Sequence, residues 1–142
     1  MKIKRWLKVV SAICLLLMLC VAFVWTSGYM PFTDRNGVRH ALGVSRLPLS
    51  VEISAVRVDS WTDYIFNADI TVDPSDMDYL LSGRDFKKQD DKGEIPEYYI
   101  DNYEAFDHDS RYVWGDYSKL GVSCSLYVNR TEGRIFIDYG AD

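Results

Sequence analysis

The residues best suited to chemistry or recognition lie between Tyr98 and Tyr117, where aromatic side chains alternate with carboxylates. Tyr and Trp are common in binding hot spots because each offers a large rigid surface with one polar tip. The same side chains also fill cores and hold loops in place, which is the alternative interpretation. The residues that we predict to form a partner-binding surface are Tyr98, Tyr99, Tyr103, Asp107, Asp109, Tyr112, Trp114 and Tyr117.

His108 is the clearest candidate for acid–base chemistry, because Asp107 and Asp109 flank it in the chain. Nearby carboxylates raise the pKa of a histidine, but a general base also needs a substrate pocket and usually a nucleophile. A deep pocket that joins His108 to two carboxylates would therefore favour an enzyme. The residue pattern supplies no such constellation, so we predict no catalytic residues and a protein that is not an enzyme.

The run Asp107-His108-Asp109 also matches the first positions of a calcium-binding loop. Such a loop needs a third oxygen ligand at its fifth position and Gly at its sixth. Arg111 and Tyr112 stand at those positions. We therefore predict a solvated acidic loop, with neither a metal site nor a cofactor.

Cys124 lies in an alternating segment between Ser123 and Ser125. A nucleophile elbow would need Gly where Ser125 stands, so this serine pair does not match that motif. The alternation turns Cys124 inward and predicts a buried, unreactive thiol. It is the only cysteine after residue 28, so the domain that follows cannot form an internal disulfide.

The charge of the chain is distributed unevenly. Residues 29–142 hold 12 basic and 21 acidic residues, a formal charge of −9. Such a surface repels phosphate backbones, which argues against nucleic-acid binding. The acidity either favours a basic protein partner or only keeps the domain in solution.

Residues 1–30 have the layout of a basic start followed by a transmembrane signal anchor. The run from Val9 to Trp25 contains 17 residues without charge, Pro or Gly. As a helix it would extend about 25 Å, close to the hydrocarbon thickness of a bilayer. Basic residues before it favour an N-terminus inside the cell. We predict a single-pass membrane protein, held in the membrane through residues 9–25, whose C-terminal domain lies outside the cytoplasm, in the periplasm or at the cell surface.

Two alternatives to the anchor remain open. The segment could be a signal peptide cleaved after residues 26–28, or a lipoprotein signal that places a lipid on Cys20. The lipoprotein alternative is weakened because Leu19 stands where a small residue is needed.

Residues 31–48 predict an irregular, membrane-proximal linker, because Gly43 and Pro48 interrupt any regular pattern. Residues 49–142 then form one small acidic domain. Alternating apolar residues predict a hairpin over 49–72, with a bulge in its first strand where the alternation shifts phase. In the second strand, Asn67 and Asp69 fall on the face that we expect to be wet.

The rest of the domain continues this pattern. Asp73 and Pro74 can begin a short helix that Gly83 ends. A charged loop follows over 84–97, and a second hairpin is predicted over 122–139. The fold class is therefore α+β, with two hairpins in a small antiparallel sheet and one short helix packed on it.

We accordingly expect a membrane-tethered, extracytoplasmic protein-binding module. An inhibitor or immunity protein against a cationic partner is one concrete version. The first alternative is an accessory structural subunit of a membrane protein complex, and the second is a small envelope hydrolase. The sequence leaves open whether a small-molecule ligand binds.

Overall fold

The computed structural model describes residues 2–26, 33–59, 63–96, 103 and 105–142. Its centre is a six-stranded antiparallel sheet with the order β1-β2-β6-β5-β4-β3. The strands are β1 (Glu52–Asp59), β2 (Tyr64–Thr71), β3 (Lys87–Lys88), β4 (Ser110–Gly115), β5 (Val122–Asn129) and β6 (Arg134–Ala141). The helices in the described residues are α1 (Lys2–Thr26), α2 (Asp34–Leu42), the 3-10 helix η1 (Pro74–Asp76), α3 (Met77–Leu81) and α4 (Tyr117–Leu120). The predicted α+β class with an antiparallel sheet is confirmed.

The N-terminal run forms α1, but its assignment as a membrane span is wrong. Within the described part of the chain, no helix combines the length and the apolar character that crossing a membrane requires. The uncharged part of α1 extends about 25 Å, whereas the hydrocarbon core is about 30 Å thick. This finding overturns the single-pass localisation, with its N-terminus inside and its domain outside.

The predicted irregular linker over 31–48 is wrong for its described part, because α2 forms within residues 33–48. The Thr33 side chain caps the helix by accepting a hydrogen bond from the Asn36 amide, and Gly43 ends it in the left-handed conformation with φ 69°. Val38 and Leu42 are fully buried against the sheet. These apolar residues at helical spacing belong to the domain core.

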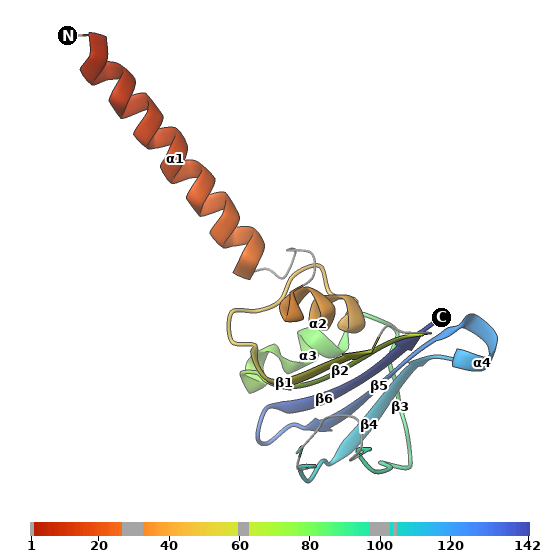
Figure 1. Cartoon of the computed structure of the whole chain (residues 1–142). Coiled ribbons are helices and arrows are strands. Elements are labelled where there is room, and N and C mark those ends of the chain that lie inside the picture. Colours follow the sequence, from red (N-terminus) through yellow and green to blue (C-terminus); the bar gives the residue numbers. More distant parts are fainter. Residues whose placement is uncertain (1, 27–32, 60–62, 97–102, 104) are drawn as a thin grey trace.

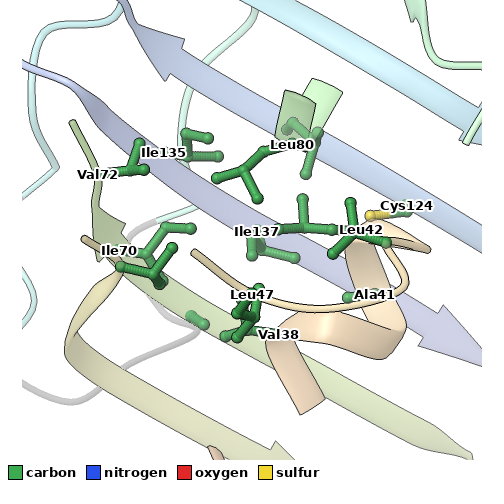
Figure 2. Packing of buried hydrophobic residues seen from close by; sticks show 14 of the residues in the cluster. Val38, Ala41, Leu42, Leu47, Ile70, Val72, Leu80, Cys124, Ile135 and Ile137 are labelled. Carbon is green, nitrogen blue, oxygen red and sulfur yellow. The ribbon is translucent and has the colours of Figure 1, made fainter. Parts of the chain in front are cut away.

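One face of the sheet, here called the first face, carries the main core. Figure 1 shows α2 and α3 on the same side of the sheet. Their apolar residues meet the inward residues of the central strands, among them Ile70, Ile137 and Cys124 (Figure 2). Cys124 has no exposed surface, and burial raises the pKa of its thiol, so the prediction of a buried thiol is confirmed.

A close approach between α2 and β2 depends on Gly37. A Cβ added at this position would overlap the ring of Phe66, a core residue of β2. The predicted bulge in the first strand is also confirmed, because the pairing of β1 with β2 shifts register between Ile53 and Ala55.

The opposite face, here called the second face, is not the wet surface that the alternation predicts. Asn67 and Asp69 are 0% and 1% exposed. The reason is a second apolar cluster in which Ile95 and Phe106 pack against Tyr127 and Phe136, the outward residues of β5 and β6. The segment between β3 and β4 thus supplies cover for a face that would otherwise be solvated.

Candidate functional site

An ion pair between Arg134 and Asp69 stabilises the segment that covers the second face. The Arg134 guanidinium donates to Asp69 through Nη2 and Nε, at 2.6 Å and 3.1 Å. The same guanidinium stacks over the Phe106 ring, 4.4 Å from its centroid. Asp69 therefore holds Arg134 in place, and Arg134 in turn supports the segment that leads to His108.

The His108 side chain lies between Tyr127 of β5 and the backbone of Lys92, in the loop that follows β3. Its ring lies edge-on to Tyr127, with 5.2 Å between the ring centroids, and it is 8% exposed. Its Nε2 lies 2.8 Å from the Lys92 carbonyl oxygen, which can only accept, so Nε2 carries the hydrogen. Lys92 Nζ returns a hydrogen bond to the His108 carbonyl at 3.3 Å. The orientation of the imidazole is therefore set by the backbone.

An open pocket of about 300 Å³ lies beside His108, at the end of the β5–β6 hairpin. It forms where residues before β4 meet the turn between β5 and β6. The Asn129 side chain joins the two parts by donating to the Asp107 carbonyl at 2.8 Å and accepting from the Glu132 amide at 2.9 Å. The lining residues are Lys92, Asp107, His108, Asp109, Asn129, Thr131 and Glu132.

The lining of this pocket is acidic on balance, because it holds three carboxylates, of Asp107, Asp109 and Glu132, and one ammonium group, of Lys92. The charges of Arg130 and Lys88 act on Asp109 from outside the lining. Asp107 has 98% of its side chain exposed, and its carboxylate lies 3.8 Å from Lys92 Nζ. An ion pair this exposed is weak and leaves the carboxylate available to a ligand.

Asp109 is more firmly held. Partial burial alone would raise the pKa of this carboxyl, but hydrogen bonds from the Ser110 hydroxyl and the Arg130 amide outweigh it. Together with the charges of Arg130 and Lys88, they lower the pKa below its usual value. Asp109 is therefore ionised at neutral pH.

The chain matches no protein-family model, curated protein or solved structure.

The structure brings together only some of the residues predicted to form a binding surface. Asp107 and Asp109 line the pocket, and Tyr103 packs on the second face with its ring centroid 5.1 Å from that of Phe136. Tyr98 and Tyr99 lie outside the described residues.

The aromatic residues of β4 lie away from this pocket. Tyr112 and Trp114 are half-buried on the first face, in contact with the main core. The Arg84 guanidinium stacks on Trp114 at 4.0 Å and donates to the carbonyls of Ala41 and His40 at the end of α2. These two rings therefore pack against the main core and stand outside the lining of the pocket.

Tyr117 lies at the far end of the sheet from the pocket. It begins α4, rests over Gly140, and its hydroxyl donates to an Asp142 carboxylate oxygen. The eight predicted residues consequently do not form one continuous surface among those that the structure describes.

Sequence reasoning missed the contributions of Lys92, Asn129, Thr131 and Glu132. The turn at 129–133 was expected, but no local signal shows that it faces residues 92 and 107–109. A search of the described ranges finds no group of three His, Cys, Asp or Glu side chains placed to hold a metal ion.

Proposed function

We propose that this protein is a non-enzymatic binding module that recognises a basic partner protein through the acidic pocket beside His108. The supporting observation is a cavity of about 300 Å³ bordered by three carboxylates and one ammonium group. A cavity of that size can take the end of a long side chain, and its excess of negative charge favours lysine or arginine. The formal charge of −5 for the whole chain would speed the encounter with such a partner.

The pocket has both fixed and adaptable parts. The side chains of Asp109 and Asn129 accept hydrogen bonds from backbone amides of the hairpin turn, so their positions are set before binding. Asp107 and Glu132 are exposed, so they can adjust to an incoming cation. Preorganisation of part of a site lowers the entropy lost on binding.

The test uses the intact chain as bait in an extract of its own cells, with mild cross-linking and mass spectrometry. We expect a stoichiometric basic partner whose recovery falls at least about tenfold with Asp107→Asn combined with Glu132→Gln, since charged interface contacts each contribute well over 1 kcal/mol. Asp85→Asn is the matched control, because Asp85 is also exposed, with 81% of its side chain in solvent, and is absent from the pocket lining. Equal recovery with the double variant and the wild type, or no stoichiometric partner, would refute the proposal.

A hydrolase is the second candidate, because the same pocket joins His108 to Asp107 and Asp109. Because Nε2–H donates to the Lys92 carbonyl, Nδ1 is the ring nitrogen that is left for proton transfer. This candidate predicts turnover of an ester, phosphoester or peptide substrate that His108→Gln abolishes. Identical rates for the wild type and His108→Gln across such substrates would eliminate it.

A further inference from the structure

The strand β1 forms one border of the sheet, and the two-residue strand β3 forms the other (Figure 1). In the described part of the chain, the strand order places β2 on one side of β1 and no strand on its other side. The backbone N–H and C=O groups of alternate residues in such an edge strand point away from the sheet, where they can pair with another strand.

The two borders differ in how they are protected against such pairing. The strand β3 contains only Lys87 and Lys88, both exposed, and short edge strands with lysine side chains disfavour pairing between molecules. The strand β1 extends over eight residues, from Glu52 to Asp59, and contains neither lysine nor proline. Its outer edge is therefore the better candidate for adding a strand.

The bulge in β1 decides which of its side chains share a face. Glu52, before the bulge, pairs with Thr71, and Arg57, after the bulge, pairs with Asn67. Directly paired residues of antiparallel strands have their side chains on the same face, and so do alternate residues of β2. Glu52 and Arg57 therefore both lie on the second face, whereas in a regular strand residues 52 and 57 would lie on opposite faces.

This arrangement makes β1 complementary to a second copy of itself. When two β1 strands pair antiparallel with Glu52 of each copy opposite Arg57 of the other, a two-fold axis relates two identical Glu–Arg pairs. The same register sets Ile53 opposite Val56 of the other copy, and both residues lie on the first face. Opposite charges directly across two strands stabilise the pairing, and like charges destabilise it.

The neighbouring antiparallel registers that keep the faces aligned lack this match. A shift in one direction sets Glu52 opposite Asp59 of the other copy, so that two negative charges meet. A shift in the other direction sets Glu52 opposite Ala55, where no charge is available. Charge therefore favours the register in which Glu52 lies opposite Arg57.

We propose that the outer edge of β1 is an interface for a second copy of this chain, which joins two sheets into one through the Glu52–Arg57 register. Arg57 also pairs with Asp59 at 3.6 Å, but its side chain is 42% exposed and an exposed pair of this kind is weak, so the guanidinium can also bind Glu52 of the other copy. Glu52 is itself exposed. The residues that line the acidic pocket begin at Lys92, so this interface does not depend on the function proposed for that pocket.

Two competing explanations must be separated from this one. A bulge can also twist an edge strand away from a partner, which would keep the protein monomeric. Copies could instead associate through α1, where apolar side chains such as Leu17 and Phe23 are 60% and 59% exposed.

The test is sedimentation equilibrium of the full-length chain at pH 7, in an excess of a neutral detergent that covers the apolar side chains of α1. We expect a dimer in the wild type. Glu52→Lys places a positive charge opposite Arg57 at both symmetric positions, and it should weaken the dimer by about tenfold or more. Combining Glu52→Lys with Arg57→Glu exchanges the two charges and keeps the net charge, and it should restore the dissociation constant to within about threefold of the wild-type value.

Asp85→Lys is the matched control. It changes the net charge by the same amount as Glu52→Lys, at a side chain that is 81% exposed and lies just before β3, at the other border of the sheet. This variant should leave the dissociation constant unchanged. Circular dichroism and urea unfolding show whether each variant is folded.

Three outcomes would overturn the proposal. The first is a wild-type chain that stays monomeric up to about 1 mM, as expected if the bulge prevents pairing. The second is a dimer that is equally stable in the wild type and in Glu52→Lys, as expected for association through α1. The third is a folded double variant that dimerises no more tightly than Glu52→Lys, because charge would then not select this register.

Discussion

Replacing Asp69 with asparagine should lower the free energy of unfolding by about 3 kcal/mol. The Asp69 side chain is 2% exposed and accepts two hydrogen bonds from Arg134, at 2.6 Å and 3.1 Å. Removing one partner of a buried ion pair costs about 3–5 kcal/mol, because the other charge remains desolvated. Arg134 has 31% of its side chain exposed and can be partly rehydrated, which places the cost at the lower end of that range.

The assay is equilibrium unfolding in urea at pH 7, followed by tryptophan fluorescence and analysed as a two-state transition. The control is Asp78→Asn, which breaks the Arg130–Asp78 pair of 2.8 Å, whose carboxylate side chain is 85% exposed. Exposed pairs contribute little, so this variant should cost about 0.5 kcal/mol. If Asp69→Asn costs no more than Asp78→Asn, the conclusion that burial strengthens the Asp69–Arg134 pair is incorrect.

Three further predictions concern packing and pH. Gly37→Ala should destabilise the fold by about 1–3 kcal/mol, measured by urea unfolding, because its Cβ would meet the Phe66 ring. Arg84→Lys should cost about 1–2 kcal/mol and shift the tryptophan emission, since lysine cannot both bridge the α2 carbonyls and stack flat on Trp114. The hydrogen bond to Asp142, with burial and the nearby Asp142 and Asp63 charges, raises the pKa of Tyr117 to about 12 from 10.0. Its contribution should be complete below pH 10 and lost as the pH rises towards 12, so the stability difference from Tyr117→Phe should shrink over that interval.

The alternation of apolar residues was a sound guide to the strands whose inner face meets the main core. Cys124 and Leu126 of β5 and Ile137 of β6 are buried as that pattern predicts. The pattern works because successive side chains of a strand point to opposite faces, and this geometry is local to the chain. The turn between β5 and β6 was also predictable, because residues 129–133 carry their own local turn signal.

Other elements were harder to predict because their local signals were weak or ambiguous. The helix α2 lies in a stretch with a turn dipeptide at Asn36-Gly37, and it is stabilised mainly by Val38 and Leu42 packing on the sheet. The strand β4 lies among charged and aromatic residues, and its place beside β5 follows from long-range pairing. The apolar character of residues 9–25 led correctly to a helix but incorrectly to a membrane span.

The amino-acid sequence by itself determined the α+β class, the inward face of the central strands and the acidity of the domain. Only the tertiary structure decided which residues of the second face are buried, where Asn67 and Asp69 proved to be covered. It also decided that residue 92, the segment 107–109 and the turn at 129–132 share one pocket. The physical reason is that the alternation of apolar residues shows only which face of its own strand a side chain occupies. Whether that face is buried depends on a segment from elsewhere in the chain, here the residues between β3 and β4.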